Sequence, residues 1–300
     1  KVHCVTDGGV TAPAAWMFNQ KRNSETGRLE KWPQLSDEDI SKNFPQVDGE
    51  ARAPLSFGCT VLQFPHIIVI LDASLGNLAP PLFPAFTKTR PLISDLREVL
   101  KSLEIKPEDV NYVVHTHMHL DHTGWNVING DDGKPIPLFP NAKHVVQRAE
   151  WAYWTSSEPL KSRARLEQNF GPLMDRDMML IIDGDKLLCP GILLRLAPGH
   201  TPGHQVVRIQ GGDEAVAYFV GDALHQVAQV CRPDWSPFFD WAPQMSALAR
   251  VDLLKQIASE DAVLLSPHFP FPGVGMVKQS DGLRGWSFEE LPVGSPLQQI

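Results

Sequence analysis

Four histidines and one aspartate fall within eight residues of the segment HTHMHLDH: His115, His117, His119, Asp121 and His122. The whole chain has 11 histidines in 300 residues, so this density is unusual. Imidazole and carboxylate are the ligands that zinc and similar divalent ions prefer. Buried together without a cation, these groups would leave several polar atoms unsatisfied. The segment therefore predicts a metal site. His115 lies within the preceding apolar run and is expected to pack in the sheet.

Further ligand-type residues follow other apolar runs along the chain. His200 and His204 lie in LAPGHTPGH, Asp222 follows AVAYFVG, and His268 follows AVLLSP. The ends of strands at one edge of a sheet are neighbours in space, however far apart they are in sequence. Seven residues become candidate ligands: His117, His119, Asp121, His122, His200, Asp222 and His268. One tetrahedral ion takes four ligands, so seven suit two ions if one carboxylate bridges them.

The elements that must position these residues are short strands and a few helices. Segments typical of strands are CTVLQF, HIIVILDAS, VNYVVHTH, AKHVVQ, KLLCPGILLRLA, HQVVRIQ, AVAYFVGD and AVLLSP. The first two are expected to form a hairpin. Helical periodicity covers PLISDLREVLKSLEI and PQMSALARVDLLKQIASE, whereas 148–170 is helical but irregular. This pattern predicts packed sheets covered by helices in one domain over 1–300, in which 1–55 form an irregular N-terminal arm.

Composition argues against two classes of partner. The net charge is −8 and no block of Lys and Arg occurs, so neither nucleic acid nor an anionic membrane surface is expected to bind. A small-molecule substrate is the expected partner, and a homodimer stays open. The chain begins at Lys1 and shows no signal peptide. A cytoplasmic location is favoured, and a mature secreted or periplasmic form stays open.

The motif THMHLDH resembles the THxHxDH motif of the metallo-β-lactamase superfamily. PGHTPGH, the pair Gly221–Asp222 and the segment SPH ending at His268 resemble its later motifs in the same order, over the span from Cys59 to Val277. The resemblance implies an α+β fold, an αββα sandwich of two packed mixed β-sheets with helices on the outer faces. It assigns His117, His119 and His200 to a first ion, Asp121, His122 and His268 to a second, and Asp222 to both. His204 is expected to support the ligands.

The segment after His268 and the wide gap between His122 and His200 resemble the methyl parathion hydrolase and lactonase-type branch. This implies a hydrolase with two divalent ions, most simply zinc, with Mn, Fe and Co as alternatives. A hydroxide bridging the ions would attack a neutral lactone or ester, or a phosphotriester. The catalytic candidates are Asp121, which could pass a proton to the leaving group, and Asp222. The alternative is a thioesterase of the glyoxalase II kind.

Substrate contacts are expected from aromatic residues in irregular segments that flank the ligands. The candidates are Phe83, Phe86, Trp151, Trp154 and Phe170, together with His225, three residues after Asp222. Each could instead pack in the core, and both interpretations stay open. An apolar mouth without a cationic clamp would favour neutral esters and lactones over anionic substrates.

Overall fold

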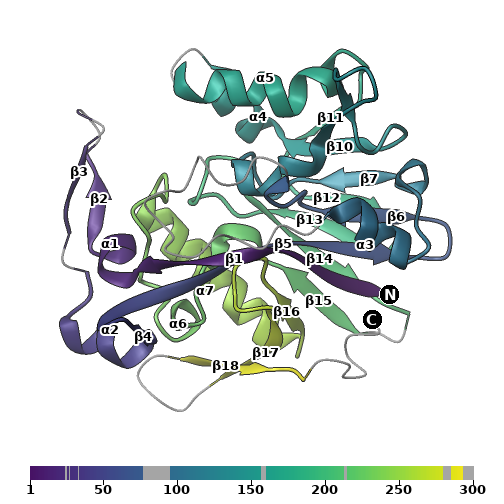
Figure 1. Cartoon of the computed structure of the whole chain (residues 1–300). Coiled ribbons are helices and arrows are strands. Elements are labelled where there is room, and N and C mark those ends of the chain that lie inside the picture. Colours follow the sequence, from purple (N-terminus) through teal and green to yellow (C-terminus); the bar gives the residue numbers. More distant parts are fainter. Residues whose placement is uncertain are drawn as a thin grey trace.

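The fold is described by a computed structural model of the chain (Figure 1). The structure describes residues 1–23, 26, 28–32, 34–76, 95–156, 160–212, 215–279 and 285–292. Among them are two seven-stranded sheets and two small hairpins.

The first sheet combines the N-terminal strands with the strand that leads into the histidine-rich segment. Its order is β1 (Val2–Pro13), β5 (Glu50–Gln63), β6 (Ile68–Leu71), β7 (Tyr112–Val114), β10 (Lys143–Gln147) and β11 (Met179–Ile182), with β4 (Gln46–Val47) paired to β5. β1, β5 and β6 are antiparallel, whereas β6, β7, β10 and β11 run parallel. The sheet is therefore mixed.

The second sheet follows the chain order of its strands. These are β12 (Lys186–Cys189), β13 (Ile192–Leu196), β14 (Gln205–Gln210), β15 (Val216–Phe219), β16 (Val263–Leu265), β17 (Val274–Gln279) and β18 (Trp286–Glu290). Only β15 and β16 pair in parallel, because a helix connects them. The hairpins are β2 (Gln20–Arg22) with β3 (Leu29–Lys31), and β8 (Val127–Asn129) with β9 (Pro135–Pro137).

The main hydrophobic core lies between the two sheets. Leu62 and Val69 of the first sheet belong to one buried cluster with Leu194, Val207 and Phe219 of the second. Alternate residues of each strand point into this layer, and their burial supplies the dominant stabilisation of such a sandwich.

Helices cover the outer faces of both sheets (Figure 1). Leu96 and Leu100 of α3 (Leu96–Ser102) pack against the first sheet, and Leu253 and Ile257 of α7 (Pro243–Ser259) pack against the second. The remaining helices are α1 (Ala14–Phe18), α2 (Asp37–Asn43), α4 (Arg148–Thr155), α5 (Leu160–Met174) and α6 (Ala228–Cys231). Short 3₁₀ turns at Pro107–Asp109, Leu120–His122, Gly124–Asn126 and Gly221–Ala223 complete these elements. The predicted αββα arrangement is confirmed.

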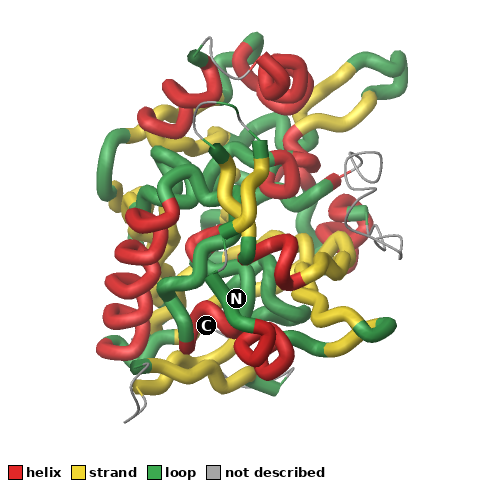
Figure 2. The backbone as a smooth tube through the Cα atoms, turned by 90° about the vertical axis from the view of Figure 1, so that its left-hand side faces the viewer, coloured by secondary structure: helices red, strands yellow, loops and turns green. Residues whose placement is uncertain are grey.

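The expectation of an irregular arm over 1–55 is wrong. β1 is 12 residues long and pairs with β5 along its length, with an irregularity between Thr6 and Gly8. A Cβ on Gly9 would lie 2.8 Å from the carbonyl oxygen of Leu55, so the two backbones approach closely. These glycines and the irregularity hide the strand alternation from sequence reasoning. The β2–β3 hairpin that follows lies nearest the viewer in Figure 2.

Several predicted elements are confirmed with small shifts of their bounds. CTVLQF and HIIVILDAS form the β5–β6 hairpin, and the second predicted helix is α7. The first predicted helix is described from Leu96, and its first residues, 91–94, lie outside the described residues. The irregular helical segment is α4 followed by α5, which contains Pro172. One domain over 1–300 stays a prediction.

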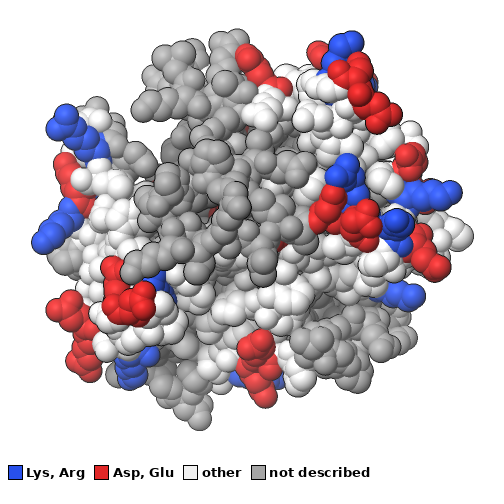
Figure 3. Space-filling view, in the orientation of Figure 1, with Lys and Arg blue, Asp and Glu red and all other residues white. Residues whose placement is uncertain are grey.

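The surface of the described residues carries mixed charge. On the face shown in Figure 3, basic and acidic side chains lie beside one another around the rim of the molecule. Among the helices that the structure describes, none is both long and apolar enough to cross a bilayer.

Candidate metal centre

Five strands end at the same edge of the sandwich, and each end is followed by polar residues. Asp72 follows β6, the histidine-rich segment follows β7, His200 follows β13, Asp222 follows β15, and His268 follows β16. Asp72, His117, His122, His200, Asp222 and His268 are all at most 3% exposed. The structure therefore brings together residues that are up to about 200 positions apart in sequence, as the strand-end argument predicts.

His117, His119 and His200, here called the first triad, turn one ring nitrogen each toward a common point. His119 Nδ1 lies 2.8 Å from His117 Nε2 and 2.9 Å from His200 Nε2. Together with Asp222 they place four ligand-type atoms within 4.8 Å of one another.

Asp121, His122 and His268, the second triad, converge beside the first. The Nε2 atoms of His122 and His268 are 3.2 Å apart, and Asp121 Oδ2 lies 3.8 Å from each. The Asp121 side chain is 19% exposed, so it is the most accessible member of the second triad.

Asp222 lies between the triads, and its two oxygens face different sides. Oδ2 lies 3.1 Å from His200 Nε2, whereas Oδ1 lies 2.9 Å from the Nε2 atoms of both His122 and His268. Burial alone would raise the pKa of this carboxyl, but the imidazoles around it, His122 first, hold the pKa well below its usual value. Asp222 is therefore ionised and positioned to bridge two cations.

The other ring nitrogen of most of these histidines meets an oxygen acceptor. His122 Nδ1 lies 2.7 Å from Asp72 Oδ2, and His200 Nδ1 lies 2.9 Å from Asp240 Oδ1. His117 Nδ1 lies 3.0 Å from Thr116 Oγ1.

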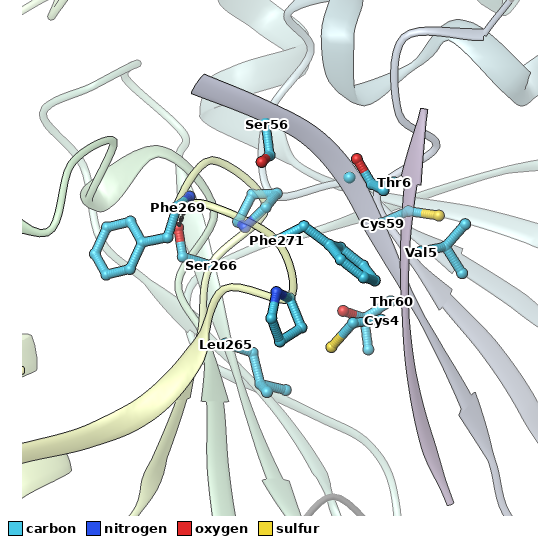
Figure 4. Close-up of a pocket in the computed structure, with 13 residues that line it drawn as sticks. Cys4, Val5, Thr6, Ser56, Cys59, Thr60, Leu265, Ser266, Phe269 and Phe271 are labelled. Carbon is cyan, nitrogen blue, oxygen red and sulfur yellow. Dashed lines mark hydrogen bonds between the residues drawn. The ribbon is translucent and has the colours of Figure 1, made fainter. Parts of the chain in front are cut away.

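His268 also has an oxygen acceptor for its second ring nitrogen, and β5 provides it. Its Nδ1 lies 2.7 Å from the carbonyl oxygen of Ser56, and the Ser56 N–H donates to the His268 carbonyl at 3.1 Å. Figure 4 shows the adjoining small pocket, where Phe271 of the loop after β16 points toward β1 and β5, whereas the Phe269 ring points away from them. The Ser266 hydroxyl accepts from the Phe269 N–H at 3.3 Å, which shapes the turn that carries His268.

These contacts decide whether the residues fit metal ions. A proton held on the nitrogen that faces an oxygen acceptor leaves the other nitrogen with a lone pair. The Nε2 atoms of His122 and His268 lie 3.2 Å apart and each lies 2.9 Å from Asp222 Oδ1, so this arrangement needs a proton or a metal ion among the three atoms. Burial would lower the pKa of His200, but Asp222 and Asp240 raise it to about 9. The buried carboxylates of Asp222 and Asp240 therefore favour positive charge at this site. The surrounding imidazoles and carboxylates are a ligand set suited to divalent ions.

The other histidines near the site have partners within the protein. His204 Nε2 accepts from the Asp222 N–H at 3.1 Å, in keeping with its expected supporting role. His115 packs under the triads, where its Nε2 lies 3.1 Å from His144 Nδ1. His225 is 2% exposed, and its Nε2 lies 3.0 Å from Asp222 Oδ2. His225 therefore also forms a ligand-type group with Asp222 and His268.

A groove of 1410 Å³ opens onto the first triad, because His119 and His200 are part of its lining. The hairpin β2–β3, the segment 233–241, α4 and the first half of α7 form its walls. Its large apolar residues are Trp32, Tyr153, Trp154, Phe238, Phe239, Trp241 and Leu248. A substrate with an apolar part could therefore reach the first triad through this groove.

The expected aromatic contacts separate into three groups. Trp154 lines the groove and packs edge-on against His119, with ring centroids 5.4 Å apart. Trp151 is half-buried against Phe170. The structure places Phe170 in the hydrophobic core, 1% exposed, not in the wall of the groove. Phe83 and Phe86 lie outside the described residues.

Sequence reasoning missed the residues that contact the second ring nitrogen of the histidine ligands or support those contacts. Asp72 was visible as the polar residue that ends an apolar run, so the strand-end rule could have found it. Asp240 and Arg250 carried no such pattern. Arg250 is fully buried, and its Nη1 lies 3.3 Å from Asp240 Oδ2, so α7 reaches His200 through an ion pair.

Comparison with known proteins gives one family and a group of related enzymes. The model of the Metallo-beta-lactamase superfamily matches residues 59–268. An N-acyl homoserine lactonase of Bacillus cereus is 29% identical over 164 residues, which are 54% of this chain and 57% of that protein. The N-acyl homoserine lactonase AttM of Azorhizobium caulinodans is 37% identical over 110 residues, which are 35% of this chain and 38% of that protein. The chain thus spans less than two thirds of the length of these relatives.

Solved structures resemble this one over nearly the whole chain. The dizinc quorum-quenching lactonase AidC, in complex with a product, has a TM-score of 0.73 at 21% identity and covers 97% of this chain and 94% of its own. The hydrolase AbOPH has a TM-score of 0.76 at 20% identity, with the same coverage. These likenesses support the fold, and the family match covers both triads and Asp222. This chain therefore belongs to the metallo-β-lactamase superfamily.

Proposed function

We propose that this protein is a dinuclear metal hydrolase that opens neutral lactones or esters. The observation that carries the proposal is the placement of Asp222, whose two oxygens face two separate groups of ligand-type atoms. A single ion would use one triad and leave the lone pairs of the other unpaired.

The residues that would hold the ions are the first triad on one side and the second triad on the other, with Asp222 between them. Zinc is the metal we propose, since imidazole and carboxylate are its common ligands and tetrahedral sites are usual. Two bound ions would lower the pKa of water toward about 7 and polarise a carbonyl oxygen.

Residues at the centre have two tasks in this reaction. Asp72, Asp240 and the Ser56 carbonyl keep the ligand rings oriented, because each accepts from the ring nitrogen that faces away from the ions. Asp121, the most accessible member of the second triad, is positioned to pass a proton to the leaving alkoxide.

The groove orients the substrate and excludes water from its apolar part. His119 and His200 line it together with Phe238, Trp241 and Leu248, and Leu248 is 71% exposed. An acyl substituent lying there would gain about 0.8 kcal/mol per buried CH₂. The reacting carbonyl would then face the triads while the tail extends along the groove.

The charge of the groove favours a neutral substrate. Among the described residues that line it, Lys21 is the only Lys or Arg, and its ammonium lies over the Trp32 ring, 4.3 Å from the centroid. Asp234 and Asp240 also line the groove, but each is paired with an arginine, Asp234 with Arg232 and Asp240 with Arg250. A glutathione thioester carries carboxylates that would need paired cations, so the thioesterase alternative is less favoured. The lactonase names of the relatives agree with the lactone proposal.

Steady-state kinetics on metal-replete protein tests the proposal. We expect kcat/KM to rise with acyl length across N-acyl homoserine lactones and aryl esters, and to exceed the value for S-lactoylglutathione by at least about tenfold. A paraoxon-type triester tests whether phosphotriesters are also accepted. A flat chain-length series with a clear preference for the glutathione thioester would replace the proposal by the thioesterase alternative.

A further inference from the structure

Glu150 is a buried carboxylate next to the metal centre. It lies in the first turn of α4, is 1% exposed, and is the only buried residue that this helix contributes. A fully buried carboxylate is rare unless it is paired or hydrogen-bonded. Burial raises the pKa of Glu150, while hydrogen bonds oppose this shift. The reason for this burial must lie in its partners.

Three N–H donors point at the two carboxylate oxygens of Glu150. The Met118 N–H donates to Oε1 at 2.9 Å, and the Trp154 indole N–H donates to the same oxygen at 2.6 Å. The Gly203 N–H donates to Oε2 at 3.0 Å. One carboxylate therefore joins three segments of the chain.

The three segments all contact the first triad. Met118 lies between His117 and His119, so the hydrogen bond to its N–H restrains the backbone that carries both rings. Gly203 belongs to the loop that carries His200, and Trp154 packs against His119.

The contact with the His200 loop is close enough to require glycine. A Cβ on Gly203 would lie 2.1 Å from the backbone nitrogen of Glu150. The loop therefore rests directly on the start of α4, with the carboxylate accepting from its N–H. Groups that orient metal ligands in this way commonly change metal affinity about 10- to 100-fold when they are lost.

We propose that Glu150 is a positioning residue that fixes the two loops of the first triad and Trp154 relative to one another, and so sets the affinity for one of two metal ions. This inference rests on the proposed metal centre. Because every partner of Glu150 named above is a donor, only a group with two acceptor oxygens serves all three. A glutamine would keep the volume and place an NH₂ group against at least one N–H.

The test is Glu150→Gln, measured by metal binding without substrate. Metal-free protein is titrated with Zn²⁺ against a chromophoric chelator, and with Co²⁺ while the visible absorption is recorded. We expect the affinity for one equivalent to fall at least about tenfold, with a changed Co²⁺ spectrum, and the other equivalent to stay within about twofold. Glu260→Gln is the matched control: Glu260 accepts from the Tyr218 hydroxyl at the end of α7, away from the triads, and its variant should bind both equivalents normally.

Wild-type affinity for both equivalents in folded Glu150→Gln would overturn the inference, and so would an equal loss of both. If that variant does not fold, Trp154→Phe decides, since it keeps the carboxylate and removes one donor. A weaker affinity for one equivalent supports the inference, and unchanged affinity for both overturns it. Wild-type protein that binds metal but hydrolyses neither lactones nor esters would refute the proposed function and leave this comparison of metal affinities intact.

Discussion

At the scale of single residues, most histidines of the centre use one ring nitrogen toward the ligand cluster and the other toward an oxygen acceptor. In His122 and His200 the Nδ1 atoms face Asp72 and Asp240, and the Nε2 atoms face Asp222. This division keeps the Nδ1 proton of each ring directed at its carboxylate partner, so Nε2 is the nitrogen that gives up its proton when an ion binds. The ligand rings are thus oriented by neighbouring side chains, so single substitutions should change metal binding.

Asp222 and His204 should respond differently to substitution. We expect Asp222→Asn to hold at most one ion, because a bridging carboxylate becomes a neutral amide. His204→Ala should retain both, since the ring nitrogens of His204 contact the Asp222 N–H and the Ala197 carbonyl. Metal analysis by mass spectrometry checks this. Loss of metal from His204→Ala, with both ions kept by Asp222→Asn, would contradict the assignment.

His115 and His144 make the metal-free protein sensitive to acid. They are stacked and buried, and burial lowers the pKa of His115 from 6.5 to about 4 and that of His144 well below its usual value. At these two positions the unfolded chain therefore binds more protons than the folded chain below pH 6.5. The contribution of this pair to stability is fully present above pH 6.5 and is lost as the pH falls toward 4.

The check is a series of thermal unfolding curves of metal-free protein between about pH 7.5 and 4.5. We expect the melting temperature of the wild type to fall more steeply with acid than that of His144→Gln, which has one fewer buried imidazole to protonate. Parallel pH profiles for the two proteins would show that the pair does not contribute.

At the scale of elements, the ligands could be predicted because apolar runs and polar ends follow a simple rule. A run that is buried on both faces reads as a strand, and the first polar residues after it lie at the sheet edge. This rule places Asp222 after β15 and His268 after β16 without knowledge of any contact. The family motifs then order them into two groups.

Other parts of the fold and of the site depend on long-range contacts that have no local pattern. β1 is interrupted by glycines and gains its structure from pairing with β5. The groove wall at Phe238 and Trp241 has no regular periodicity, because a loop carries it. A glutamate in a helical segment is usually expected at the surface. Only the folded chain shows that N–H groups of two loops, at Met118 and Gly203, donate to the Glu150 carboxylate.

Leu248 of α7 offers a test of the groove. It is 71% exposed and lines the groove, whereas Leu187 on β12 is 62% exposed and does not belong to the groove lining. We expect Leu248→Ala to lower kcat/KM for long acyl chains by about four- to fifteenfold, as expected for one to two lost CH₂ contacts at about 0.8 kcal/mol each, and to leave short chains nearly unchanged. Leu187→Ala should have no effect on either series. Equal behaviour of the two variants would remove α7 from the substrate path.

At the scale of the whole molecule, the sandwich places the reacting centre at an edge where both sheets contribute. The first sheet supplies the histidine-rich segment, and the second supplies His200, Asp222 and His268. Separating the sheets would therefore separate the triads, so metal binding and the packing of the sandwich should be coupled. A homodimer stays a prediction, and it is not needed to complete the triads.

The most direct test of the dinuclear claim is stepwise reconstitution of metal-free protein with Zn²⁺, with bound metal and lactone hydrolysis measured on the same samples. We expect two equivalents to bind per chain, and most of the activity to appear as the second site fills. Full activity at one equivalent, or a chain that never holds more than one ion, would contradict the account.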